Sequence, residues 1–262
     1  MREHSEVALR VRGLRSHYGD VEVLHEVDAT FARGKITVVA GRSGCGKTTL
    51  LRNILRLIDP TSGTIELFGR DISELEEDEL VNLRPRIGVL FQNGALLQSL
   101  TVGANISVPL EQHTRLPADV IERIVLRKLQ LVELNGVEHF MPSELSGGMR
   151  KRAALARTLA LDPEIVFFDE PSAGLDPVTA ASLDRLIVEL SRKLGITVIV
   201  VTHELTSIRH IADRMLFLDA GRAVFEGTVE EAEVCPVDSV RQFFRQGSSE
   251  PLGRRSPGGQ PM

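Results

Sequence analysis

A glycine-rich loop at positions 41–49, GRSGCGKTT, constrains this chain more than any other segment. It lies between an apolar run at 36–40 and a helix expected over 48–58. Gly41, Gly46, Lys47 and Thr48 fit the spacing G-x-x-x-x-G-K-[ST]. Glycines allow the positive φ values that turn backbone N–H groups toward a phosphate, and a helix N-terminus favours the same anion. The loop therefore predicts a nucleoside triphosphate site.

Each part of this loop has an expected chemical task. Lys47 can reach the β- and γ-phosphates of ATP, and the Thr48 hydroxyl can coordinate Mg²⁺. Cys45 precedes a helix N-terminus beside Lys47, which predicts a thiol of lowered pKa and raised reactivity. A glycine turn with a chance lysine is the alternative, and the strand and helix on either side argue against it. The other loop residues expected around the nucleotide are Arg42, Ser43, Gly44 and Thr49.

Composition excludes several other classes of protein. The chain has 262 residues, a formal net charge of −5 and a sequence pI near 5.9. It therefore lacks the basic surface expected of a nucleic-acid partner. No apolar run approaches the ~20 residues that cross a bilayer, and the first residues lack the apolar core of a signal peptide. Two cysteines are too few for a disulfide framework and suit a reducing cytosol. These features predict a protein of the cytoplasm.

Apolar runs along the chain predict an α/β fold with parallel strands. A region between about 102 and 161 is mostly helical instead, and an apolar stripe marks a helix over 118–134. This region predicts a helical insertion within the α/β core. The last residues, 247–262, are rich in Gly, Pro and Ser and are predicted to be disordered. The expected strands are 7–11, 21–31, 36–40, 64–68, 87–91, 165–168, 196–201 and 215–218.

Two carboxylates follow one of these strands. Four apolar residues at 165–168 suit a strand covered on both faces, and Asp169 and Glu170 come next. Ligands of parallel sheets bind at this end of the strands. Asp169 is expected to hold Mg²⁺, and Glu170 to orient or deprotonate the attacking water. A strand leading into a solvated turn is the alternative, which the preceding phosphate loop makes the weaker one.

The sequence LSGGM at 145–149 narrows the class of protein. Ser146, Gly147 and Gly148 can form a second phosphate-binding surface where a helix begins. In isolation these residues could equally be a flexible joint or an ordinary helix cap. They lie between the phosphate loop and Asp169, where the ATPase subunits of ABC transporters carry LSGGQ. The chain resembles that family from about residue 7 to 244.

The resemblance implies a fold and further site residues. It implies an ABC-type P-loop NTPase core over 7–246, with an antiparallel β subdomain and a helical subdomain at about 95–161. Tyr18 resembles the aromatic that stacks on adenine, and Gln92 the glutamine that senses Mg²⁺ and water beside the permease. The loop 172–176, which includes Asp176, resembles the one that crosses the dimer interface. His203 resembles the histidine that contacts the γ-phosphate. Each of these residues would be uninformative alone, and their shared order along the chain supports the resemblance.

The same resemblance implies partners. Two copies would enclose two ATP molecules head to tail, with Ser146, Gly147 and Gly148 acting on the nucleotide of the other copy. An integral-membrane permease would dock in a groove beside the Gln92 loop. The apolar and small residues of 94–110 would contribute to that contact, although many would only pack under the helical subdomain.

Finer matches point to one branch of the family. The segments FQNGALLQSLTVGANISVPL, EQHTRLP and MPSELSGGMRKRAALARTLAL, at 91–110, 111–117 and 141–161, closely resemble the ATPase of MlaFEDB-type lipid transporters. Met149, which replaces the usual glutamine, is either a variation of this branch or the mark of a degenerate site. The resemblance implies phospholipid movement between bacterial membranes from the cytoplasmic face of the inner membrane. A Mce-domain protein and a small STAS-type regulatory subunit are further implied partners.

Three alternatives remain open at this point. An ABC importer subunit for a small solute such as an amino acid belongs to the same class. A soluble ABC ATPase of DNA repair or of the ribosome usually has a long coiled-coil insertion or two ATPase domains, and this chain has neither. A simple P-loop kinase would not account for LSGGM together with His203.

Overall fold

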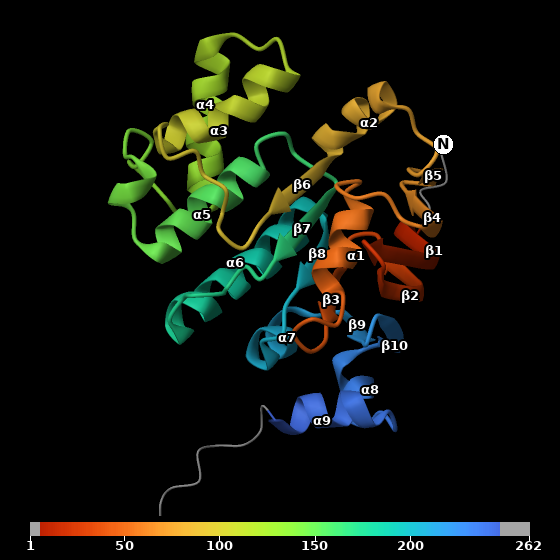
Figure 1. The fold of residues 1–262 in the computed structure, drawn as a ribbon. Coiled ribbons are helices and arrows are strands. Elements are labelled where there is room, and N and C mark those ends of the chain that lie inside the picture. Colours follow the sequence, from red (N-terminus) through yellow and green to blue (C-terminus); the bar gives the residue numbers. More distant parts are fainter. Residues whose placement is uncertain (1–5, 247–262) are drawn as a thin grey trace, which may run out of the picture.

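A mainly parallel six-stranded sheet forms the centre of the molecule (Figure 1). The computed structural model describes residues 6–246. The strand order is β10-β9-β3-β8-β7-β6, in which the neighbours from β9 to β6 are parallel and β10 is antiparallel to β9. The strands are β3 (Ile36–Ala40), β6 (Ile87–Leu90), β7 (Ile165–Asp169), β8 (Thr197–Val201), β9 (Arg214–Asp219) and β10 (Arg222–Gly227).

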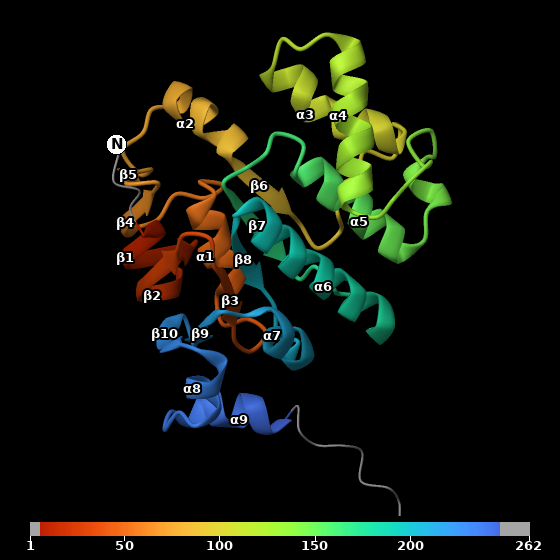
Figure 2. The same ribbon diagram turned by 180° about the vertical axis from the view of Figure 1, so that it is seen from behind.

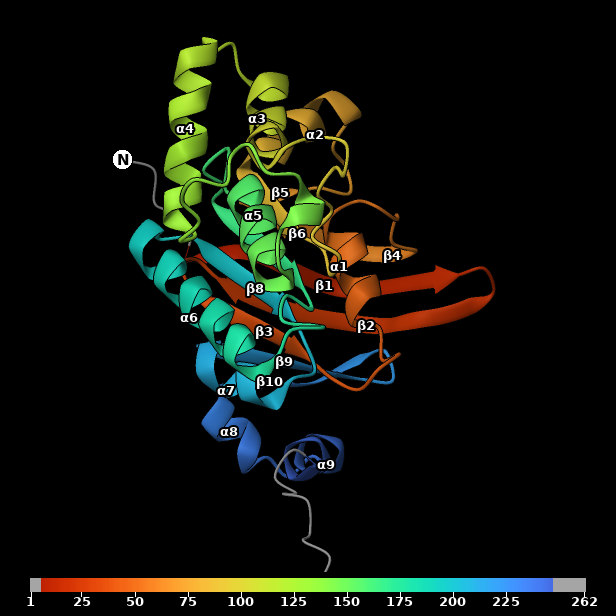
Figure 3. The same ribbon diagram turned by 90° about the vertical axis from the view of Figure 1, so that its left-hand side faces the viewer.

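A second, antiparallel sheet has four strands in the order β2-β1-β4-β5. Its strands β1 and β2 form a long hairpin, which Figure 3 shows from the side. The strands are β1 (Val7–Tyr18), β2 (Val21–Ala32), β4 (Ser62–Leu67) and β5 (Arg70–Asp71). This sheet confirms the predicted antiparallel β part of an ABC-type α/β fold.

Helices cover the central sheet and extend from one side of it (Figures 1 and 2). Three of them, α3, α4 and α5, pack on one another where the sequence predicts mostly helix. In residues 6–246, none of the helices combines the length and apolar character needed to span a membrane. The helices are α1 (Lys47–Ile54), α2 (Glu77–Leu83), α3 (Val102–His113), α4 (Ala118–Leu131), α5 (Gly147–Thr158), α6 (Pro177–Leu194), α7 (Leu205–Ile211), α8 (Val229–Glu233) and α9 (Asp238–Gln246), with short 3₁₀ turns at Arg84–Arg86 and Pro142–Glu144.

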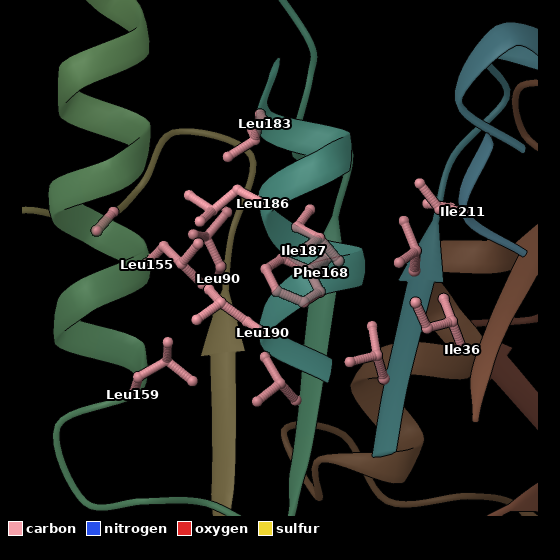
Figure 4. Close-up of a cluster of buried hydrophobic side chains, with 14 of the residues drawn as sticks. Ile36, Leu90, Leu155, Leu159, Phe168, Leu183, Leu186, Ile187, Leu190 and Ile211 are labelled. Atoms are coloured by element: carbon pink, nitrogen blue, oxygen red, sulfur yellow. The ribbon is translucent and has the colours of Figure 1, made fainter. Parts of the chain in front are cut away.

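The central strands are apolar because both of their faces are covered. All five residues of β3 and of β8 are buried, as expected for strands inside a parallel sheet. Successive residues of β7 point to opposite faces: Phe168 joins the core under α5 and α6, and Phe167 joins the core beside α1 and the antiparallel sheet. Figure 4 shows four α6 side chains lying between α5 and the sheet: Leu183, Leu186, Ile187 and Leu190.

The predicted bounds of several elements were wrong for identifiable reasons. The helix after the phosphate loop ends at Ile54 instead of 58, because Arg56 adopts a left-handed φ of 51°. The helix predicted to reach 134 ends at Leu131, shortly before Glu133 turns to a φ of 58°. The first strand continues past 11 to Tyr18, since a bulge near Gly13 interrupts its register without ending it. The predicted disorder of 247–262 lies outside the described residues.

Candidate nucleotide-binding site

Four neighbouring strands bring the predicted site residues to one edge of the central sheet. The order β3, β8, β7, β6 is continuous, and these strands are parallel, so their carboxyl ends lie side by side. The phosphate loop follows β3, His203 follows β8, Glu170 follows β7 and Gln92 follows β6. Parallel sheets bind ligands at this edge. The topology therefore gathers residues that lie far apart in the sequence.

Glycine is required at both ends of the phosphate loop. Gly41 has a φ of 150°, and an added Cβ would lie 2.2 Å from the carbonyl oxygen of Leu218. Gly46, with a φ of 105°, is the N-cap of α1, and its added Cβ would lie 2.7 Å from Cδ2 of Leu24. These approaches leave no room for a side chain, so the tight course of the backbone between β3 and α1 requires glycine at both positions. This is the local geometry that the glycine spacing predicts.

Lys47 is the buried cation of this loop. Its Nζ donates to the carbonyl oxygens of Gly41, at 2.8 Å, and of Arg42, at 3.0 Å. The ammonium group is thus held over the loop by the loop's own backbone. Thr48 beside it is exposed. Ser43 and Gly44 are exposed as well, whereas Thr49 is buried against the core.

Glu170 makes direct contacts with the segment that follows β8. Its Oε2 accepts a hydrogen bond from the Thr202 hydroxyl at 3.1 Å, and its Oε1 lies 2.7 Å from Nδ1 of His203. The backbone of Glu170 has a left-handed φ of 49°, a strained conformation that is held by its N–H donating to Val201. The sequence predicts Glu170 and His203 separately, and the structure brings them into contact.

Asp169 lies beside Glu170 in a half-buried position. Burial raises the pKa of its carboxyl, and the nearby charge of Glu170 raises it further, while Arg52, Lys47 and Lys151 act in the opposite direction. Within the described part of the chain, no group of three or more His, Cys, Asp or Glu side chains is placed to hold a metal ion. A Mg²⁺ ion does not need such a group, since it often binds one carboxylate together with waters and nucleotide phosphates. The hydroxyl of Thr48, the amide of Gln92 and the carboxylate of Asp169 are all oxygen donors of the kind that suits Mg²⁺.

Lys151 belongs to this region although sequence reasoning gave it no role. It lies on α5, and its buried Nζ donates to the backbone carbonyl of Gln92 at 2.5 Å. Burial lowers the pKa of this ammonium group, while the charges of Asp169 and Glu170 raise it. The only sequence signal was the basic stretch RKR after LSGGM, which suggests a solvated helix face rather than a buried lysine.

The LSGGM segment begins α5, as predicted for a helix N-terminus. Ser146 is the N-cap, and its hydroxyl accepts from the backbone N–H of Met149 at 3.3 Å. Gly147 lines a cleft of about 210 Å³ together with Gln92 and Leu175, and none of residues 41–49 lines that cleft. An added Cβ at Gly148 would lie 2.5 Å from Cγ2 of Thr179, so the close approach of α5 to α6 requires glycine there. The Met149 side chain packs against the core.

Two further predicted residues have clear local contacts. Asp176 is the N-cap of α6, and its Oδ1 accepts from the backbone N–H groups of Val178 and Thr179 at 3.1 and 3.0 Å. The hydrogen bond from the Thr179 hydroxyl, and then those from the backbone, hold the pKa of this carboxyl below its usual range. Tyr18 ends β1 and is 44% exposed, and its hydroxyl accepts from Nη1 of Arg52 on α1 at 3.0 Å. The aromatic ring therefore lies beside the helix that follows the phosphate loop.

The prediction of an activated Cys45 thiol was wrong. Cys45 is buried, and this burial raises the pKa of its thiol above the ordinary value. The charge of Lys47, whose Nζ lies 4.0 Å from Sγ, acts in the opposite direction and does not prevail. The local rule about helix N-termini fails here because desolvation of the thiolate is the larger effect.

Comparisons with known proteins show which family the chain is similar to. Residues 24–173 match the sequence profile of the family described as ABC transporter. The chain is 42% identical to the "Intermembrane phospholipid transport system ATP-binding protein MlaF" of Escherichia coli K12, over 90% of this chain and 88% of that protein. It is 40% identical to the "Probable ribonucleotide transport ATP-binding protein mkl" of Mycobacterium leprae, over 94% and 71% of the two chains.

A solved structure has the same fold. The dimeric ATP-binding cassette MJ0796, described as a post-hydrolysis state bound to ADP and Pi, aligns with a TM-score of 0.77 at 30% identity, covering 84% of this chain and 98% of that one. The chain therefore belongs to the ABC transporter family and carries that family's ATPase domain.

Proposed function

We propose that this chain is the ATP-hydrolysing subunit of a bacterial ABC transporter that moves phospholipids between the inner and outer membranes. The catalytic part of the proposal rests on one observation above all, the contact of Glu170 with His203 and Thr202 at the edge that carries the phosphate loop. The cargo rests on the similarity to MlaF along nine tenths of the chain. Such a transporter maintains the lipid asymmetry of the outer membrane.

The proposed roles combine the resemblance to the family with the position of each residue in the fold. Lys47 and the loop N–H groups bind the phosphates, and the ring of Tyr18 stacks on adenine. Thr48, Gln92 and Asp169 would hold Mg²⁺, which would screen the phosphate charge when bound. Glu170 takes the proton of the attacking water. His203, oriented by its contact with Glu170, faces the γ-phosphate.

A second copy of the chain completes the site in this proposal. The cleft beside Gly147 contains no residue of the phosphate loop, which supports a nucleotide held between the phosphate loop of one copy and Gly147 of another. In a head-to-tail pair, Ser146, Gly147 and Gly148 of one copy face the nucleotide of the other, and the loop ending at Asp176 crosses between them. The related cassette MJ0796 is described as a dimer, which supports this arrangement.

A permease would dock beside the Gln92 loop. A groove of about 230 Å³ lies there between β6, α3 and α5, with Gly94, Pro109 and Arg157 in its lining. On the same loop, Leu97 exposes 42% of its surface, and its backbone N–H and carbonyl are both hydrogen-bonded to the Asn105 side chain. An apolar side chain held out by a fixed backbone suits a protein contact. The permease would attach the ATPase peripherally to the inner membrane, and a Mce-domain protein and a STAS-type subunit complete the proposed complex.

The test is reconstitution of the purified complex with its permease in lipid vesicles. We expect ATP turnover to rise with phospholipid supplied as cargo, and labelled phospholipid to move in an ATP-dependent way. If turnover instead rises with a ribonucleotide, an amino acid or another small solute, the phospholipid assignment is wrong and the ATPase assignment remains. The name of the Mycobacterium leprae relative makes the ribonucleotide arm necessary.

A charge at Leu97 tests the docking surface separately. We expect Leu97→Asp to reduce ATP-dependent transport strongly while leaving nucleotide binding intact, because it places a carboxylate in an apolar contact. Leu194→Asp is the matched control, since Leu194 is 41% exposed at the far end of α6. Equal transport by both variants would remove Leu97 from the permease contact.

A further inference from the structure

A buried carboxylate contacts the segment that follows Glu170. Asp184, on α6, is only 3% exposed and is held between two other buried side chains, Ser172 and Ser207. The Ser172 hydroxyl donates to its Oδ1 at 3.2 Å. Burial raises the pKa of this carboxyl, and hydrogen bonding by the Ser207 and Ser172 side chains acts in the opposite direction. Carboxylates are rarely withdrawn from water unless they are hydrogen-bonded, because desolvation is costly. This arrangement therefore calls for a reason.

The two serines belong to the two segments that meet at Glu170. Ser172 comes two residues after Glu170 and begins the loop that ends at Asp176, the N-cap of α6. Ser207 lies on α7, which starts two residues after His203. Because Thr202 and His203 both contact the Glu170 carboxylate, the two segments already meet at that residue. Asp184 links the same two segments a second time, through Ser172 of one and Ser207 of the other.

We propose that Asp184 is a positioning residue that makes the 172–176 loop and the His203 segment move together. The inference rests on the proposed head-to-tail dimer, in which the 172–176 loop of each copy reaches the nucleotide of the other copy and His203 reaches its own. A hydrogen bond to a carboxylate is stronger than one between neutral groups, and it is costly to break when buried. Movement of one segment is therefore passed to the other. Asp184 thereby couples the two ATP sites of the dimer.

The test is a double-mutant cycle on cooperativity in the full-length chain assembled in its complex. ATP turnover is measured against ATP concentration for wild type, Ser172→Ala, Ser207→Ala and the double variant. We expect a wild-type Hill coefficient between one and two, since a dimer has two sites. Each single change should lower it toward one, and the double change should lower it no further, because either serine alone breaks the link. Asp184→Asn should retain part of the cooperativity, since its amide oxygen still accepts from a hydroxyl.

Ser191→Ala is the matched control. Ser191 is likewise a buried serine, but it lies on α6, and its hydroxyl donates to the carbonyl of Ile196 at 2.9 Å. This variant should lower thermal stability as the others do and keep the wild-type Hill coefficient. If Ser172→Ala and Ser207→Ala likewise lose stability and keep the cooperativity, or if the wild type shows none, the inference is overturned. An absence of ATP hydrolysis in the wild type would instead refute the proposed function.

Discussion

Replacement of Glu170 by glutamine isolates the charge of this residue from its size. In the wild type, the Thr202 hydroxyl lies 3.1 Å from Oε2 of Glu170, and Nδ1 of His203 lies 2.7 Å from Oε1. In the variant, the amide oxygen can still accept the hydrogen bond from Thr202, and the amide N–H can face the ring nitrogen of His203. We therefore expect the local structure and the ATP affinity to be retained. What the variant loses is the carboxylate that takes a proton from the attacking water.

The size of the expected effect follows from that single loss. A positioned general base contributes about 10²- to 10⁴-fold in rate. This range corresponds to about 3 to 5 kcal/mol of transition-state stabilisation, at about 1.4 kcal/mol for each factor of ten. We expect Glu170→Gln to lower ATP turnover by at least ~10²-fold, at the lower end of that range. Phosphate release by the assembled complex and calorimetric nucleotide binding measure the two quantities independently.

The control is a second glutamate changed in the same way. Glu189 lies exposed on α6, where it pairs with Lys193 at 3.1 Å, and Glu189→Gln should leave both turnover and binding unchanged. Turnover of Glu170→Gln within a few-fold of wild type would refute the assignment of the general base. Loss of nucleotide binding together with turnover would show that the variant disturbs the phosphate site rather than the chemistry.

Three further outcomes are expected from the structure. Because burial raises the pKa of the Cys45 thiol, less thiolate is present at neutral pH. Maleimide should therefore label a Cys235→Ser protein more slowly than a free cysteine peptide, and the labelling rate should rise with pH. Labelling as fast as that of the peptide would contradict the burial of Cys45. Tyr18 is the only tyrosine and tryptophan is absent, so intrinsic emission reports on Tyr18 and should change when its ring stacks on the adenine of ATP. An unchanged emission at saturating ATP, with binding checked by calorimetry, would place the adenine away from Tyr18. Asn105→Ala removes four hydrogen bonds of a fully buried amide. Urea unfolding should show that the free energy of unfolding falls by about 2 to 4 kcal/mol, whereas a fall below about 1 kcal/mol would mean that water replaces these hydrogen bonds.

Elements whose cause is local could be predicted from the sequence. The phosphate loop is recognisable because its glycines, its lysine and its hydroxyls all lie within nine consecutive residues. The strands β3, β7 and β8 were predicted within a residue or so of their observed bounds, because strands buried on both faces are continuous apolar runs. The short strand β10 and the helix α2 were missed, since both are mostly polar or half exposed and lack such a run.

Features that depend on tertiary packing could not be predicted. The Cys45 environment was misjudged because its neighbours in the sequence suggest a polar site, whereas its Sγ lies under Gly41, where an added Cβ would be 2.6 Å away. Lys151 and Asp184 are charged residues on helices, which a sequence pattern assigns to solvent. Only the packing of α5 beside the Gln92 loop, and of α6 against α7, makes them buried.

The strand order explains why the contact between Glu170 and His203 forms at all. The two residues are separated by 33 positions, and they meet because β8 lies between β3 and β7 in the sheet. With β8 in that place, the residues after its carboxyl end lie between the phosphate loop and Glu170. A histidine there can contact Glu170 on one side and, in the proposed complex, the γ-phosphate on the other. The chain runs from β8 through His203 directly into α7, so His203 and Ser207 belong to one continuous segment. The geometry that orients the histidine thus also connects it to Asp184 and to the loop proposed to reach the second nucleotide.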